Sequence, residues 1–196
     1  YMINIGTFIV GELAKGKDAP YSVRNDWVNL GCMSQLVTSL QVHTSNPAKN
    51  MAEFIAAAKA SGKTHTWGTS GATTMHSGIG HLFFDTYGIP HKKVPFKGGS
   101  KVLAALLGGT IDVAMIAEGN KATLDGQTRI LAEGTPMKNP VTPSAPILTE
   151  AGYPIAPAIF FGVAGPAGLP TEVLNKWDQV MAKVVRSDEF KKLAAA

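Results

Sequence analysis

Short apolar runs alternate with helical patterns along most of the chain, and this alternation constrains the fold more than any other feature. Between residues 64 and 132, runs rich in β-branched or apolar residues are followed by glycine-containing turns and then by apolar residues at helical spacing. Such alternation favours parallel βαβ units. We therefore expect an α/β protein with mainly parallel sheets.

The pattern places each element on a residue range. Strands are expected at residues 33–43, 64–67, 91–95, 111–116, 129–132 and 159–164. Helices are expected at residues 51–60, 74–87, 102–107, 120–124, 171–185 and 187–194. Asn50 and Ser100 are the predicted N-caps of two of these helices. Four prolines between Thr135 and Pro146 indicate a loop or a linker that crosses between lobes.

Composition excludes several classes of protein. The chain is 45% hydrophobic and only 16% charged, which excludes intrinsic disorder. The net charge of +4 comes without a dense basic patch, so no nucleic-acid partner is expected. The longest uncharged segment, residues 152–170, contains four prolines and is not a membrane span. Cys32 is the only cysteine, so no intrachain disulfide can form, and we expect this thiol to be buried.

The loop at residues 68–74 is the first candidate site, because it joins an expected strand to an expected helix. Its two glycines allow tight turns, and its four hydroxyl groups exceed what a simple helix cap needs. A helix N-terminus adds free N–H groups and the positive end of a dipole, so the loop is a candidate seat for a carboxylate or phosphate. The residues concerned are Thr69, Ser70, Gly71, Thr73 and Thr74.

His76 lies in the first turn of the same helix and either donates a hydrogen bond to the anion or is a partly buried polar residue. Its spacing of five from His81 turns the two rings in different directions, so no metal site is expected. The loop also resembles a nucleophile elbow around Ser70. A hydrolase of that type needs an acid and then a histidine far downstream, whereas the last histidine is His91. A serine hydrolase is therefore the weakest alternative.

A second loop precedes the next expected helix and offers free N–H groups in the same way. It contains Pro95, Lys97, Gly98 and Gly99, and Lys97 either adds a positive charge to the site or is solvated. Neither nucleotide-binding glycine motif is present, so no cofactor is indicated. Asp112 is expected to serve the turn before a strand rather than catalysis.

Motifs in a fixed order along nearly the whole chain resemble one known family. They include Asn25-Asp26-Trp27-Val28, Gly68-Thr69-Ser70-Gly71, Val94-Pro95-Phe96-Lys97-Gly98, Leu106-Leu107-Gly108-Gly109 and Phe161-Gly162-Val163-Ala164-Gly165-Pro166. Each motif is weak alone, but the ordered set is similar to the extracytoplasmic solute receptors of tripartite tricarboxylate transporters, the TctC or Bug family.

The resemblance implies a type II periplasmic-binding-protein fold, in which two α/β lobes close on a ligand. It implies a periplasmic receptor that holds a small carboxylate, either a di- or tricarboxylate or an aromatic acid, and delivers it to a membrane permease. Family members hold the ligand through loops that match residues 69–74 and 97–99 here. An effector-binding domain of a transcription regulator with the same fold is the main alternative, although no helix-turn-helix segment is visible.

Compared with the family, the chain is expected to be truncated at both ends. Residues 1–38 and 159–196 are expected to form a partial first lobe, and residues 39–158 a complete second, ligand-binding lobe. The incomplete lobe is expected to expose strand edges, which favours self-association.

Overall fold

The computed structural model describes residues 2–117, 119–154 and 157–194. They form two compact units: unit 1 comprises residues 1–35 and 160–196, and unit 2 comprises residues 36–159. A compact unit is not by itself a ligand-binding lobe, so the lobe roles expected for residues 1–38, 39–158 and 159–196 stay predictions. No helix in the described ranges is long and apolar enough to cross a membrane.

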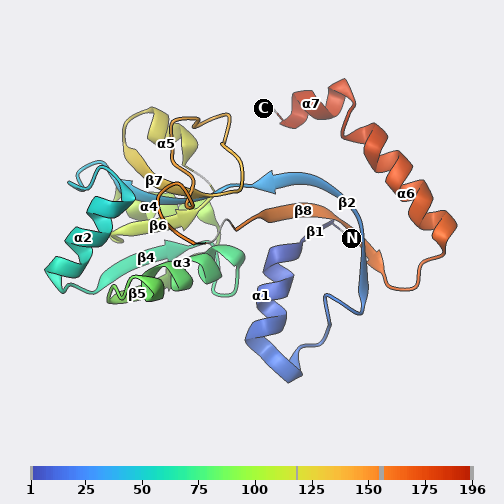
Figure 1. The fold of residues 1–196 in the computed structure, drawn as a ribbon, viewed down its shortest axis with the longest axis horizontal. Helices are drawn as coiled ribbons and strands as arrows, with labels where there is room; N and C mark the ends of the chain where they lie inside the picture. Colours follow the sequence, from blue (N-terminus) through green and yellow to red (C-terminus); the bar gives the residue numbers. More distant parts are fainter. Residues whose placement is uncertain (1, 118, 155–156, 195–196) are drawn as a thin grey trace. The chain divides into compact units, whose positions relative to one another are not determined.

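Unit 2 is built on a five-stranded sheet with the order β5-β4-β6-β3-β7 (Figure 1). The strands are β3 (Thr38–His43), β4 (His65–Thr69), β5 (His91–Pro95), β6 (Val113–Ile116) and β7 (Thr128–Gly134). Its helices are α2 (Met51–Ser61), α3 (Met75–Thr86), α4 (Gly99–Leu107) and α5 (Asn120–Leu124).

The sheet is mixed, which corrects the expectation of mainly parallel sheets. Strand β4 pairs in parallel with β5 and with β6, as the βαβ pattern predicts. Strand β3, however, runs antiparallel to both β6 and β7. A strand pattern defines only which faces are buried, and the direction of β3 is decided by partners far away in the sequence.

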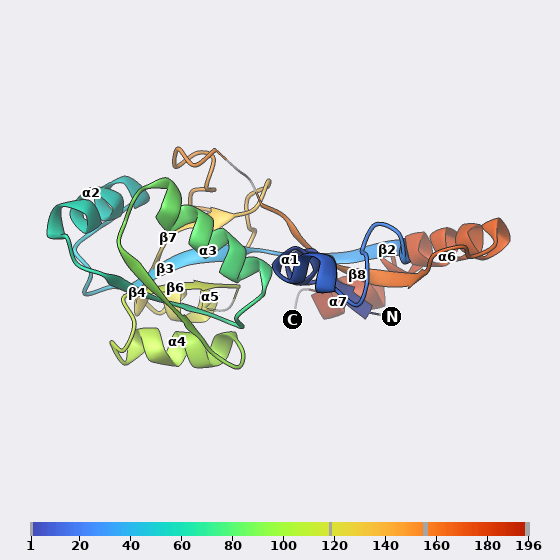
Figure 2. The same ribbon diagram turned by 90° about the horizontal axis from the view of Figure 1, so that it is seen from below.

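Each face of the sheet is covered by its own hydrophobic cluster. Figure 2 shows α2 and α3 on one face and α4 on the other. Side chains on β6 alternate between the two, because Val113 and Met115 pack with α2 and α3 whereas Ala114 and Ile116 pack with α4. All four side chains are buried, so the strand reads as a continuous apolar run rather than as an alternating one.

Helix α2 shows how local chemistry sets an element's bounds. The Asn50 side chain accepts a hydrogen bond from the Glu53 N–H, and Gly62 ends the helix in the left-handed conformation. The cap predicted at Asn50 is therefore confirmed. The cap predicted at Ser100 is wrong, because α4 begins at Gly99 with Gly98 as its N-cap, two residues before Ser100.

Unit 1 holds a three-stranded sheet with the order β1-β8-β2. Its elements are β1 (Met2–Asn4), α1 (Ile5–Lys15), the 3₁₀ helix η1 (Gly16–Asp18), β2 (Trp27–Leu36), β8 (Ile159–Pro166), α6 (Thr171–Val184) and α7 (Asp188–Ala194). The last residue of β2, Leu36, and the first residue of β8, Ile159, belong to unit 2. An aromatic cluster anchors α1, because the Phe8 ring lies 4.5 Å from that of Trp27 and Tyr21 stacks on Trp27 at 5.5 Å.

Three expectations for unit 1 and its border need correction or stay open. The strand expected at residues 33–43 is two strands, β2 and β3, which are interrupted at Val37. Cys32 lies on β2 and is exposed, not buried. Helix α1 was not predicted at all. The edges of the unit 1 sheet are β1 and β2, and self-association through them stays a prediction.

Candidate functional site

Two loops of unit 2 leave the same edge of the sheet because their strands end in register. Thr69, the last residue of β4, pairs with Pro95, the last residue of β5, and also with Met115 on β6. In a parallel sheet the carboxyl ends of the strands share one edge, and ligands bind outside that edge. The loop at residues 70–74 and the turn at residues 96–98 are thus neighbours, as the candidate site requires.

Glycine is required where β4 turns into the first loop. A Cβ atom on Gly68 would lie 2.6 Å from both Ile111 Cδ1 and Val102 Cγ1, so the strand can pass over α4 only without a side chain. Gly71 has a φ of +142°, a value that other residues rarely adopt. The sequence motif is therefore a consequence of close packing and backbone geometry.

The first loop is held by its own hydroxyl groups. Thr74 caps α3, because its side chain accepts a hydrogen bond from the Ser77 N–H at 3.3 Å. Thr69, which is fully buried, contacts Thr74 through their hydroxyl oxygens at 3.4 Å. The Ser77 hydroxyl donates to the Ala72 carbonyl at 2.8 Å. Thr69 and Thr74 are thus committed to the loop's own conformation.

Four consecutive amides in this loop are left available. Within the described residues, the N–H groups of Ser70, Gly71, Ala72 and Thr73 donate to no protein acceptor. They precede the N-terminus of α3, where the helix dipole is positive. An acceptor-only group such as a carboxylate would satisfy these donors.

Ser70 and His76 meet beside these amides. The Ser70 hydroxyl oxygen lies 3.3 Å from His76 Nδ1, and His76 is a buried residue, 6% exposed. Of the two readings of His76 in the sequence, burial is confirmed, and the contact with Ser70 brings the ring to the loop. Whether it donates to an anion stays a prediction.

The turn after β5 is tied directly to the first loop. The Phe96 N–H donates to the Thr69 carbonyl at 2.9 Å, which places the start of the turn against the end of β4. Gly98 adopts a φ of +101° and is the N-cap of α4 without a side-chain hydrogen bond. Pro95, Lys97 and Gly98 are exposed and Gly99 is buried. The ligand-binding role of these residues, like that of residues 69–76, stays a prediction.

Lys93, which the sequence did not single out, is tied to the candidate loop. Its ammonium group donates to the Ala72 carbonyl at 3.0 Å and to the Ser77 hydroxyl at 3.1 Å. The alternation of side chains along a strand could have identified Lys93. In β5, Lys93 faces the same side as His91, whereas Lys92 faces the other side and is exposed.

Asp112, which was expected to serve the turn before a strand, lies at the opposite edge of the sheet. Its carboxylate accepts hydrogen bonds from the Thr66 N–H and hydroxyl, both at 2.8 Å, and from Lys63 at 2.7 Å. It therefore joins the starts of β4 and β6. No group of three or more potential metal ligands gathers anywhere in the described part of the chain.

Comparisons with known proteins agree on one family. Residues 8–196 match the family described as the tripartite tricarboxylate transporter family receptor, TctC. A Cupriavidus necator protein named for the gbd 5' region is 27% identical over 184 residues, covering 90% of this chain and 56% of that protein. The chain thus spans little more than half the length of this curated relative.

Solved structures show the same fold. A periplasmic transporter structure superposes with a TM-score of 0.85 at 22% identity, covering 97% of this chain and 65% of that chain. A TctC solute-binding protein from Polaromonas gives 0.84 at 21% identity with the same coverage. An R. palustris protein solved with adipate gives 0.72 at 25% identity, covering 87% of this chain and 58% of that chain.

The family match extends over both units and includes both loops of the candidate site. The family is one of solute receptors rather than enzymes, so the contact between Ser70 and His76 is not read as part of a hydrolase. On this evidence, the chain belongs to the TctC family of tripartite tricarboxylate transporter receptors.

Proposed function

We propose that this chain is the main ligand-binding part of a periplasmic receptor for a small carboxylate, which the receptor delivers to a membrane permease. The observation that carries the proposal is the set of four amides at residues 70–73, which donate to no acceptor in the described part of the chain and precede the N-terminus of α3. One ligand carboxylate accepts hydrogen bonds from these amides.

The side chains of the loop divide into two roles. Ser70 and Thr73 add hydroxyl donors to the carboxylate, and His76 orients the Ser70 hydroxyl through the contact at 3.3 Å. Thr69 and Thr74 act indirectly, because their hydroxyls contact each other and Thr74 caps α3. Gly71 lets the backbone turn its amides toward one point.

The turn after β5 completes this side of the ligand site. Lys97 is exposed and supplies a positive charge that attracts the anion, while Pro95, Gly98 and Gly99 shape the backbone in front of α4. The second lobe closes with the first around the ligand, and the permease binds the closed form because the ligand stabilises it.

Carboxylate ligands are supported by two related structures. An R. palustris protein was solved with adipate, and the MatC protein of Rhodopseudomonas palustris was solved with malate. Neither ligand is assigned to this chain by that similarity, but both carry the chemical group that the amides of residues 70–73 require. A di- or tricarboxylate is therefore the first class to test.

Thermal unfolding of the purified chain with adipate, malate and the neutral analogue adipamide tests the proposal. A ligand present at 100 times its Kd stabilises the folded state by about 2.7 kcal/mol. We expect an acid to raise Tm and adipamide to leave it unchanged. Ser70→Ala should reduce the shift, whereas Thr64→Ala, an exposed threonine at the other end of β4, should not. Equal shifts with the acid and with adipamide would overturn the proposal, as would no shift with either acid.

A further inference from the structure

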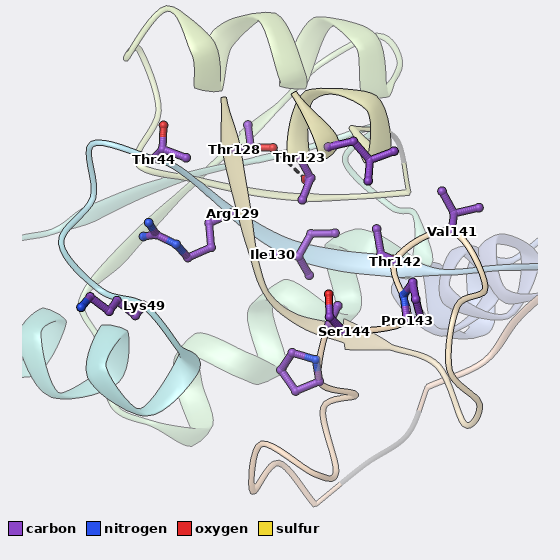
Figure 3. Close-up of a pocket in the computed structure, with 13 residues that line it drawn as sticks. Thr44, Lys49, Thr123, Thr128, Arg129, Ile130, Val141, Thr142, Pro143 and Ser144 are labelled. Atoms are coloured by element: carbon purple, nitrogen blue, oxygen red, sulfur yellow. Dashed lines mark hydrogen bonds between the residues drawn. The ribbon is translucent and has the colours of Figure 1, made fainter. Parts of the chain in front are cut away.

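Unit 2 contains a pocket of about 510 Å³ away from the loops described above (Figure 3). It is lined by Thr44, just after β3, and by Thr128 at the start of β7, and His43 pairs with Thr128 across these strands. Because β3 runs antiparallel to β6, this end of β3 lies at the edge where β4 and β6 begin. The candidate carboxylate site lies at the opposite edge, where β4 and β6 end.

Two cations line one side of this pocket. Figure 3 shows Arg129 and Lys49 on the same side of the pocket. Arg129 Nη1 donates to the carbonyls of Asn46 and Ala48 at 3.0 and 2.7 Å, so the guanidinium is held in place by the backbone. Among the residues that the structure describes, neither cation forms an ion pair.

Two described acidic side chains near these elements, Glu53 and Glu133, are engaged elsewhere. Glu53 accepts hydrogen bonds from the Lys49 N–H and the Asn50 side chain at the start of α2. Glu133 is fully buried and accepts hydrogen bonds from Thr142 and Asn139. Among the described residues that line the pocket there is no aspartate or glutamate, so none of them neutralises Arg129 or Lys49.

The other side of the pocket is apolar. Leu124, at the end of α5, is 68% exposed, and Val141, in the loop at residues 135–146, is 50% exposed. Figure 3 places Val141 across the pocket from Arg129, with Ile130 between them. The hydroxyl-bearing residues Thr44 and Ser144 also line the pocket.

We propose that this pocket binds a small organic acid with an apolar tail. The carboxylate pairs with Arg129 and Lys49, and the tail covers Leu124 and Val141, which removes apolar surface from water. The volume lies within the range of pockets that bind small molecules, about 300–1,000 Å³. The site is separate from the carboxylate seat at residues 70–73, so one lobe would bind acids at two opposite edges of its sheet.

Titration of the ¹⁵N-labelled chain with hexanoate, followed by NMR, tests this site. We expect saturable shifts of the amide signals of Thr44, Thr128 and Ser144 with a Kd of about 1 mM, as suits a small, weak ligand. Hexanol has the same tail without the charge. It should bind at least about fivefold more weakly, because it loses the ion pairs that the hexanoate carboxylate forms with the two partly exposed cations.

Two pairs of variants separate the pocket from general effects of charge. Lys49→Gln should weaken hexanoate about two- to fivefold, whereas Lys59→Gln, an exposed lysine at the far end of α2, should not. Leu124→Asp should weaken it by about fivefold or more, because it adds a like charge and removes apolar contact, whereas Met137→Asp, at a site that is 67% exposed, should not. All four positions are exposed, so folding should survive each change.

Each other outcome overturns the inference. Equal affinities for hexanoate and hexanol would show that the cations do not contribute to binding. Unchanged affinity for hexanoate in Lys49→Gln and Leu124→Asp would show that the ligand does not bind in this pocket. Shifts confined to residues 70–73 would mean that hexanoate binds only at the other edge. A chain that responds to adipate but shows no hexanoate shift here would contradict this inference and leave the proposed receptor function standing.

Discussion

The Lys93 ammonium group on β5 donates a hydrogen bond to the main-chain oxygen of Ala72, 3.0 Å away in the loop that follows β4. The same ammonium donates to the Ser77 hydroxyl, which in turn donates to the Ala72 carbonyl. Two donors, one from a strand and one from a helix, therefore converge on this one carbonyl of the loop. This arrangement turns the carbonyl of Ala72 toward Lys93 and fixes the loop that carries the four available amides.

Lys93→Met should weaken carboxylate binding without unfolding the chain. Methionine keeps an unbranched apolar stem but removes both hydrogen bonds, so the loop loses part of its fixed conformation. Loss of about 1 kcal/mol of this preorganisation corresponds to about fivefold weaker binding. Calorimetric titration with adipate measures the change. Lys92→Met is the matched control, because the neighbouring lysine is exposed on the other side of β5, and an equal loss there would point to net charge instead.

Asp112→Ala should destabilise the sheet at its other edge. It removes the acceptor of three hydrogen bonds that join Lys63 and Thr66 to the start of β6 and leaves the Thr66 donors unsatisfied. The expected cost is about 1–3 kcal/mol in urea unfolding. Asp125→Ala breaks only an exposed pair with Lys121 and should cost less than about 1 kcal/mol. Equal losses of unfolding free energy in the two variants would show that the three hydrogen bonds of Asp112 stabilise the sheet no more than an exposed ion pair does.

Gly80→Ala should be the more damaging of two changes on α3. A Cβ atom at Gly80 would lie 2.3 Å from Cζ3 of the buried Trp67 ring, so the helix must move away from β4. Overpacking of this kind costs about 1–3 kcal/mol. Leu82→Ala, at a position that is 45% exposed on the same helix, should cost less. A smaller loss of urea stability in Gly80→Ala than in Leu82→Ala would contradict this account.

Much of unit 2 could be predicted because the relevant signals are local. Strand β5 and helix α5 occupy the predicted residues, and Asn50 caps α2 as its side chain requires. The loop at residues 68–74 was found because tight turns need glycine and helix starts favour hydroxyls. These signals depend on neighbours within a few residues, which a sequence displays directly.

The missed features depend on distant partners. The antiparallel direction of β3 follows from pairing with β6 and β7, and no local pattern distinguishes it from a parallel strand. Lys93 acts on Ala72, 21 residues away, only because β4 and β5 pair in register. The pocket at Arg129 and Lys49 likewise brings together segments that are far apart in the chain.

His81 connects the same lysine to the pH dependence of stability. The pKa of His81 is lowered, first by burial and then by the positive charges of Lys93 and His91, against which Asp85 acts weakly. Its folded pKa therefore lies below the unfolded value of about 6.5. Between these two values the unfolded chain binds the proton and the folded chain does not. His81 thus lowers stability as the pH falls through 6.5 toward the folded pKa.

NMR titration of the His81 ring should show a lower midpoint in the folded chain than in the urea-unfolded chain. Lys93→Met removes the second-largest cause of the lowering, so it should move the folded midpoint upward, while Lys92→Met on the other side of β5 should leave it in place. A folded midpoint at or above the unfolded one would contradict the assignment. Lys93→Met should both raise the titration midpoint of His81 and weaken the binding of adipate. The two measurements together test whether the one ammonium group affects both.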